Sequence, residues 1–135
     1  MKGQANSRSG TPDSIRESLK KAVTELLVLL VLRKRPMYNY EIMQEIDKLS
    51  DGSIVFNTLY QAIYRLQGFH YITERGKELV DNRVRIFFAI TPEGEIYLDR
   101  LIAEYRSFTM TISRILETSN DWKEEKGNNN TDGRN

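Results

Sequence analysis

Basic side chains outnumber acidic ones in residues 56–90, a segment whose second half alternates between apolar and polar residues. Residues 56–90 carry five basic and three acidic side chains, and Lys77, Arg83 and Arg85 border a polar turn within that segment. The whole chain has a net charge of only +1, but a protein that binds a polyanion needs a basic face rather than a basic total. The distribution indicates contact with phosphate groups, although an ordinary solvated surface would give the same counts.

The residues used in most covalent and metal-dependent catalysis are scarce. The 135-residue chain has no cysteine and one histidine, His70, which excludes a thiol nucleophile, a disulfide framework and a histidine cluster for a metal. No nucleophile–base pair, phosphate loop or metal-ligand spacing occurs. Glu93 and Glu95 suit the start of a helix better than a catalytic pair. We therefore expect no catalytic residues, no metal and no cofactor.

Length and composition indicate one soluble domain. The sequence is 39% hydrophobic and 29% charged, as in ordinary globular proteins, and its length suits a single core. The longest apolar run, Leu26–Leu32, is far shorter than the roughly 20 residues that cross a bilayer. No apolar stretch near the N-terminus could act as a signal peptide. We expect a cytoplasmic protein without a membrane partner, with a disordered arm at residues 1–10 and a disordered tail at 119–135.

Apolar residues recur at helical spacing in three segments of the first half. The first segment runs from about residue 11 to 32 and is apolar on all sides at its end, which predicts deep burial there. The second spans about Asn39–Leu49, with Asn39 as its N-cap, and the third spans about Asn57–Gln67. The basic residues 33–35 between the first two helices fit either a helix C-terminus or a contact with DNA.

A fourth helical segment opens at Thr91–Pro92–Glu93 and continues to about Thr118. At about 1.5 Å per residue this helix would be roughly 40 Å long, which exceeds what a small core can cover. Its long apolar stripe therefore predicts a second copy of the chain as a partner, in a homodimer.

A β-hairpin separates the third and fourth helices. Alternation of apolar residues predicts strands at Tyr71–Arg75 and Val84–Ile90, joined by a turn over residues 76–82 with Lys77 at its tip. Two short helices followed by a basic hairpin are typical of a winged helix-turn-helix. We expect an α+β, mostly helical fold: a winged-helix DNA-binding domain over residues 11–90 and a C-terminal dimerisation helix over residues 91–118.

In such a fold the third helix enters the major groove of double-stranded DNA and the hairpin meets the phosphates. Gln61 could read adenine edges, and Arg65 could pair with phosphate or guanine. The expected contacts on the third helix are Asn57, Thr58, Tyr60, Gln61 and Arg65. Those on the second helix and the hairpin are Tyr38, Asn39, Lys77, Arg83 and Arg85. An interaction module that binds protein or RNA without operator specificity is the alternative.

Four stretches, taken in order, resemble the PadR family of transcriptional regulators. They are the apolar Leu26–Leu32, the box Met37–Ile42, the pattern Asn57–Tyr60 followed by Arg65–Leu66, and the stretch Arg83–Thr91 followed by Gly94. Asn39 stands where the family usually has glycine, Gln61 where it often has proline and Gln67 where it has an acid. The departure at Gln61 implies a recognition surface of its own.

The resemblance implies a small PadR subgroup that dimerises through its first and last helices. The interface residues would be Leu19, Val23, Leu98, Leu101, Ile102, Tyr105, Phe108, Ile112 and Ile115. The resemblance also implies a repressor that binds a pseudopalindromic operator and is released by a small planar aromatic or cationic effector. That effector would lie against Ile15, Leu19, Ile102, Tyr105 and Phe108, although an aromatic stripe is more often simply dimer core.

Overall fold

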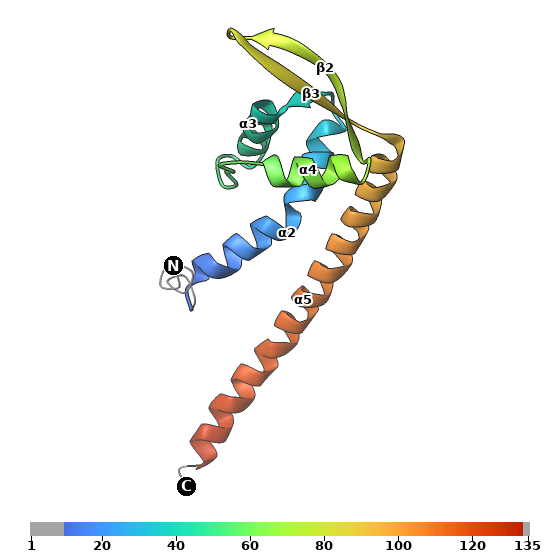
Figure 1. The fold of residues 1–135 in the computed structure, drawn as a ribbon. Helices are drawn as coiled ribbons and strands as arrows, with labels where there is room; N and C mark the ends of the chain where they lie inside the picture. Colours follow the sequence, from blue (N-terminus) through green and yellow to red (C-terminus); the bar gives the residue numbers. More distant parts are fainter. Residues whose placement is uncertain (1–9, 134–135) are drawn as a thin grey trace. The chain divides into compact units, whose positions relative to one another are not determined.

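The computed structural model describes residues 10–133, and the surroundings of side chains up to residue 122. It divides into two compact units, the first ending at Asp99 and the second beginning at Arg100. The elements, in chain order, are α2 (Pro12–Leu32), β1 (Met37–Tyr38), α3 (Asn39–Leu49), α4 (Tyr60–Gly68), β2 (Ile72–Val80), β3 (Arg83–Ile90) and α5 (Pro92–Gly133) (Figure 1). The winged helix-turn-helix expected from the sequence is confirmed, and so is the long last helix.

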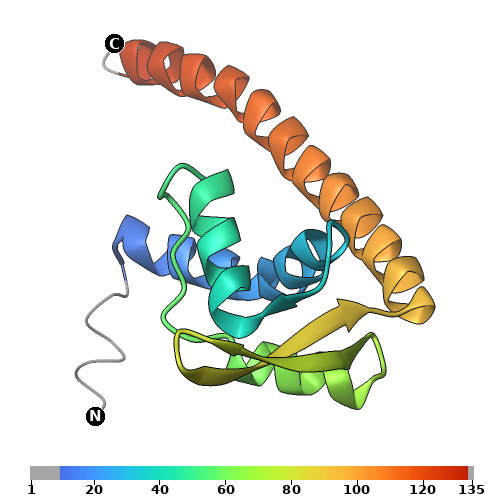
Figure 2. The same cartoon turned by 90° about the horizontal axis from the view of Figure 1, so that it is seen from above.

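The core of the first unit surrounds the C-terminal end of α2. Val28, Leu29, Val31 and Leu32 are all almost completely buried, as the apolar end of the helix predicted, although Leu30 on its other side is exposed. Helix α2 contacts α3, α4 and β3, and Figure 2 shows these elements from above. The apolar faces of α3 and α4 supply the remaining core through Ile42, Ile46, Ala62, Ile63 and Leu66.

Helix α3 has the predicted bounds, but its N-cap is Tyr38 and not Asn39. Tyr38 is extended because it belongs to β1, a two-residue strand that pairs with Phe88 and Phe87 of β3. The N–H of Tyr38 donates to the Glu41 carboxylate at 3.3 Å and closes the start of the helix. The prediction of Asn39 as N-cap is therefore wrong, because β1 keeps the preceding residue extended.

Helix α4 begins at Tyr60, three residues later than the sequence predicted. Thr58 Oγ1 accepts a hydrogen bond from the Tyr60 N–H at 3.4 Å, and local bonds of this kind compete with helix formation. Asn57 and Thr58 consequently lie in the loop that leads into α4 rather than on the helix.

The hairpin, called the wing below, is longer than predicted. Its turn consists of Asp81 and Asn82, which have φ values of 51° and 64°, as a two-residue turn of the primed type requires. Lys77 pairs with Ile86 inside the ladder, so the prediction of Lys77 at the tip is wrong. Leu79 and Val80 continue β2 as far as the turn. Asp81 and Asn82 suit the turn because their short polar side chains tolerate positive φ.

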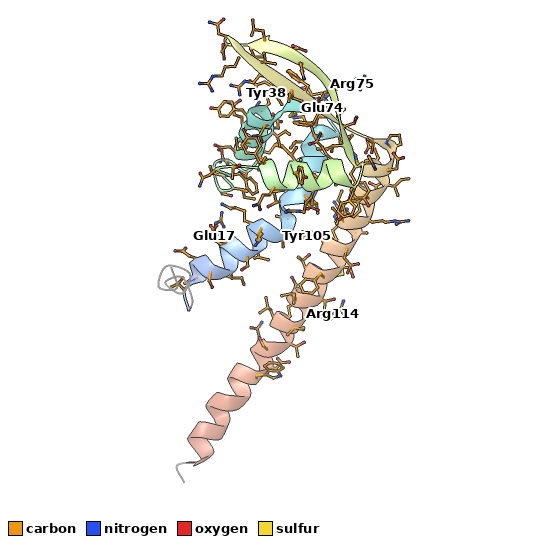
Figure 3. All side chains as sticks on the ribbon, in the orientation of Figure 1. Glu17, Tyr38, Glu74, Arg75, Tyr105 and Arg114 are labelled. Atoms are coloured by element: carbon orange, nitrogen blue, oxygen red, sulfur yellow. The ribbon has the colours of Figure 1, made fainter. Side chains whose placement is uncertain are left out.

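A β-bulge interrupts β2. Glu74 pairs with Phe88 and Gly76 with Phe87, so Arg75 is an extra residue on this strand. Beyond the bulge, Lys77 and Leu79 share a face with Ile86 and Val84, because residues directly opposite each other in a ladder point the same way. Figure 3 shows Glu74 and Arg75 next to each other on β2.

The start of α5 is bonded directly to the start of β2. The Thr91 N–H donates to the Tyr71 carbonyl at 3.0 Å, and Thr91 Oγ1 donates to the His70 carbonyl at 2.7 Å and accepts from the Gly94 N–H at 3.0 Å. The rings of Tyr71 and Tyr97 stack with centroids 4.2 Å apart. Burial and the nearby Glu25 charge raise the pKa of Tyr97.

Helix α5 continues to Gly133, past residue 118 where the sequence predicted it to end. Lys123, Glu124, Glu125 and Lys126 have high helix propensity and favour a helix that continues past residue 118. Residues 134–135, and residues 1–9 of the expected N-terminal arm, lie outside the described part. Among the described residues, no helix is long and apolar enough to cross a membrane.

Gly94 marks a close approach between the start of α5 and the residues Tyr71 and Ile90. A Cβ atom added here would lie 2.1 Å from the Tyr71 carbonyl oxygen and 2.8 Å from Ile90 Cγ1. Gly→Ala inside a helix normally stabilises by about 1 kcal/mol. We expect Gly94→Ala to do the opposite and to lower the free energy of unfolding by about 1–3 kcal/mol, because the backbone must shift.

Urea unfolding followed by circular dichroism measures this change. Gly68→Ala is the matched control, because a Cβ added at Gly68 meets nothing within 4 Å. A Gly94→Ala variant as stable as the Gly68→Ala variant would contradict the close packing.

Candidate nucleic-acid interface

Helix α4 turns one polar and aromatic face to solvent. Tyr60 and Tyr64 are 71% and 79% exposed, whereas Ala62, Ile63 and Leu66 are buried. Gln61 is also exposed, as expected for a residue that reads base edges. Tyr64 was not among the predicted contacts, although its position four residues after Tyr60 places both rings on the same side of the helix.

Arg65 lies on α4 as predicted but is not a free cation. Its Nε donates to the Glu25 carboxylate of α2 at 2.7 Å. The two residues are 40 positions apart in the sequence, so no local pattern could reveal the pair. Arg65 therefore helps to fix α4 against α2.

The basic residues 33–35 are all engaged in ion pairs. Arg33 binds Asp99 at 2.9 Å and Glu95 at 2.6 Å, and these hydrogen bonds, with Asp99 contributing most, raise the pKa of Arg33. Lys34 pairs with Glu45 and lowers the pKa of that carboxyl. Arg35 lies 3.4 Å from Glu41. These contacts favour a structural role of residues 33–35 at the end of α2 over a contact with DNA.

A cavity of about 470 Å³ lies between β3 and the starts of α3 and α4. It exists because β1 pairs only with Phe87 and Phe88, so residues 83–86 of β3 have β2 on one side and no strand of the described chain on the other. We call this cavity the wing groove. Its polar lining consists of Tyr38, Asn39, Tyr40, Tyr60, Arg83 and Arg85.

The ring of Tyr38 organises one wall of the wing groove. It meets Phe87 edge to face at 5.3 Å between centroids, and the Arg85 guanidinium lies 5.1 Å above it. This cation–π contact leaves Arg85 partly buried while Arg83 stays exposed. Figure 3 shows Tyr38 beside the wing, near the start of α3.

A second cavity of about 460 Å³ lies between α4 and the wing. Gln61, Tyr64 and Gln67 of α4 face Glu74 of the wing across it. Tyr60 lines both cavities. The carboxylate of Glu74 makes this second cavity a poorer place for a phosphate than the wing groove.

The structure brings together half of the predicted DNA contacts. Five of the ten line the wing groove: Tyr38, Asn39, Tyr60, Arg83 and Arg85. Gln61 lies in the second cavity. Four stand elsewhere: Lys77 is on the strand of the wing, Arg65 is paired with Glu25, and Asn57 and Thr58 precede α4.

The predicted dimer residues differ in accessibility. Leu98 is 0% exposed, so its place in an interface is a wrong prediction: it belongs to the core of its own chain. Ile15 and Leu19 of α2 are exposed, and Val23 is partly buried. In the second unit Leu101 and Ile102 are partly buried, and the exposed apolar residues are Tyr105, Phe108, Met110, Ile112, Ile115, Leu116 and Trp122.

The chain is similar to proteins of a known regulator family. Residues 28–100 match the model of the transcriptional regulator PadR-like family. A transcriptional regulator from Clostridium thermocellum is 26% identical, with a TM-score of 0.66 over 72% of this chain and 96% of that one. A PadR family transcriptional regulator from Eggerthella lenta has the same fold, at 23% identity and a TM-score of 0.65 over 77% of this chain and 87% of that one.

An uncharacterised protein of Lysinibacillus sphaericus is 26% identical over 105 residues, which cover 76% of this chain and 96% of that protein. The match to the family model covers more than half of the chain and includes α3, α4 and the wing. The chain therefore belongs to the PadR-like family and is a DNA-binding transcriptional regulator, not an enzyme.

Proposed function

We propose that the protein is a repressor that binds a pseudopalindromic operator as a homodimer. The observation that carries the proposal is the position of Tyr60 between α4 and the wing, where it lines one cavity with Arg83 and Arg85 and a second cavity with Gln61. A helix such as α4 fits the major groove, while cations of the wing contact backbone phosphates. Two copies related by a two-fold axis would read two half-sites.

The contacts at the start of α5 support a mechanism in which the dimer sets the distance between its two α4 helices. Arg33 binds Glu95 and Asp99, and Tyr97 stacks on Tyr71. The first turns of α5 are thereby held to α2 and to the start of β2. We infer that a change in the packing of paired α5 helices would move the two winged domains relative to each other.

Selection of bound duplexes from a random pool, followed by affinity measurements against salt, tests the DNA-binding part. We expect the slope of log K against log salt to fall by about 0.9 in magnitude for Arg83→Ala, the value for one phosphate contact. Arg65→Ala is the control: its charge is already partnered by Glu25, so we expect a smaller change. Gln61→Ala should alter the preferred base at one position of each half-site.

The same experiment separates the alternatives. Enrichment of no sequence, together with an affinity that does not depend on salt, would favour a module that binds protein or RNA. Transcription in vitro from a promoter that carries the selected site should decrease when the protein is added, and an increase would contradict repression.

The second unit supports the dimer proposal. Leu101, Tyr105, Phe108, Ile112, Ile115, Ser119 and Trp122 follow one another at alternating spacings of four and three residues. This is the a/d spacing of a coiled-coil seam. Four members of the seam are at least 47% exposed in the single chain: Tyr105, Phe108, Ile115 and Trp122. A second α5 is the partner that this spacing fits, and we propose that Leu19 and Val23 of α2 add to the interface.

Ile112→Glu should break this dimer, because it places a charge in the middle of the apolar seam. Sedimentation equilibrium should give twice the 15.8 kDa chain mass for the wild type and the single-chain mass for the variant. Ser113→Glu, which adds the same charge one position off the seam, should remain dimeric. A wild type that is monomeric at micromolar concentration would contradict the proposal.

We also propose that a planar aromatic effector binds between the paired α5 helices, against Tyr105 and Phe108. Both rings are accessible in the single chain, and an aromatic face can stack on a planar ligand. Titration with a planar cationic dye such as ethidium should show binding to the wild type and to Tyr105→Phe, which keeps the ring. Tyr105→Ala should lose about tenfold in affinity, equivalent to about 1.4 kcal/mol. Unchanged binding by this variant would refute the site.

A further inference from the structure

The free edge of β3 lies along the wing groove. Residues 83–86 have β2 on one side and no strand of the described chain on the other, and all four of them line the groove. Successive residues of a strand point to opposite faces of a sheet. A cavity that borders four residues in a row therefore lies along the edge of the strand, where backbone groups are exposed, and not over one face.

The groove continues the line of β1. This short strand pairs with Phe87 and Phe88 of β3, and the chain then leaves the sheet because α3 begins at Asn39. A strand that prolonged β1 would run antiparallel to β3 along residues 83–86, a length of about 13 Å. The groove has a volume of about 470 Å³. It therefore has the position and the length of one further strand, and exposed sheet edges bind extended peptides by strand addition.

The side chains along this edge indicate which peptide fits. Arg83 and Arg85 point to one face of the wing, because they are two residues apart on one strand. Val84 and Ile86 point to the other face and are 68% and 37% exposed. Opposite charges and apolar pairs stabilise the contact between residues that face each other on neighbouring strands. The edge therefore fits a peptide in which acidic residues alternate with apolar ones.

The charge of the groove favours a foreign segment over a second copy of β3. None of the ten lining residues is acidic, and Glu78, which faces Arg85 from β2, does not line the groove. The Tyr38 ring lies under the Arg85 guanidinium and keeps this cation beside the edge. A second β3 would bring two more arginines to the same place, where like charges destabilise a strand pair.

We propose that the edge of β3 in the wing groove binds an extended acidic peptide of a partner protein by strand addition. The peptide runs antiparallel to β3, in the order apolar, acidic, apolar, acidic opposite Ile86, Arg85, Val84 and Arg83. Hydrogen bonds between main chains provide affinity, and the alternating side chains provide specificity. Such a partner competes with DNA, because Arg83 is also among the proposed phosphate contacts.

Two blocked, fluorescein-labelled peptides test the order of residues. One contains Val-Glu-Val-Glu and the other Val-Val-Glu-Glu, so their composition and charge are the same. We expect the first to bind the full-length protein at least about tenfold more tightly in fluorescence anisotropy, a difference of about 1.4 kcal/mol. Equal binding would overturn the proposal, because attraction between charges alone does not depend on the order.

N-methylated versions of the Val-Glu-Val-Glu peptide test strand addition itself. Alternate residues of an antiparallel strand direct their N–H groups toward a given neighbour. Methylation of both Val nitrogens and methylation of both Glu nitrogens should therefore have unequal effects, although the side chains stay the same. We expect one version to bind at least about tenfold more weakly than the other. Equal binding by the two versions would overturn the proposal.

Two variants of the wing locate the site. Arg83→Glu and Arg75→Glu make the same change in charge at exposed positions, but Arg75 does not line the groove. We expect only Arg83→Glu to weaken binding of the Val-Glu-Val-Glu peptide, by at least about tenfold. A Val-Glu-Val-Lys peptide, with its Lys opposite the introduced carboxylate, should restore binding to this variant and thereby show that it is folded. Equal losses in the two variants would overturn the site.

Competition with the selected duplex tests the role of the partner. We expect saturating Val-Glu-Val-Glu peptide to weaken duplex binding at least about tenfold, and Val-Val-Glu-Glu at the same concentration to have a smaller effect. Equal effects of the two peptides would overturn the competition. If neither peptide binds while Arg83→Glu loses the duplex, the groove serves DNA and the proposal fails. If selection enriches no duplex, the proposed function fails instead, and the peptide measurements still decide this inference.

Discussion

The arrangement of the first unit depends on the need to bury a broad apolar face at the end of α2. Val28, Leu29, Val31 and Leu32 spread over this face and are all removed from water, whereas Leu30 on the other side of the helix is 36% exposed. A single neighbour could not cover so broad a face, so α3, α4 and β3 each cover part of it. Burial of these four aliphatic side chains stabilises the folded state by several kcal/mol. The position of the recognition helix α4 is in this sense a consequence of how α2 ends.

The same packing decides which cations are available for binding. Arg33, Lys34 and Arg35 at the end of α2 and Arg65 on α4 are all paired with carboxylates of neighbouring elements. These pairs are partly exposed, so each contributes little to stability, but together they orient α2, α3, α4 and the start of α5. Arg83 and Arg85 of the wing have no carboxylate lining their groove. A near-neutral chain can thus present a basic face because cations elsewhere in the first unit, such as Arg33 and Arg65, are paired with carboxylates.

Sequence patterns predicted the features that depend on local order. The four helices, the alternation in the wing and the motifs of the PadR-like family were all visible. Features that depend on distant residues were not. The two-residue β1 is too short to leave a pattern and exists only because β3 offers it an edge. The Arg65–Glu25 pair joins two helices far apart in the chain. Leu98 belongs to the apolar stripe of the last helix, but it is buried in the core of its own chain. Periodicity alone does not say which neighbour covers an apolar residue.

The bulge at Arg75 changes which residues of β2, even-numbered or odd-numbered, lie on a given face of the wing. Before it, the even-numbered residues Ile72 and Glu74 share a face with Phe88; after it, the odd-numbered Lys77 and Leu79 share that face. Loss of this one extra residue would remove the bulge and leave a regular ladder, in which the outer half of β2 keeps its partners on β3 and its faces. A relative without the extra residue would therefore present the same wing surface, so an alignment of this segment should place its one-residue gap at the bulge.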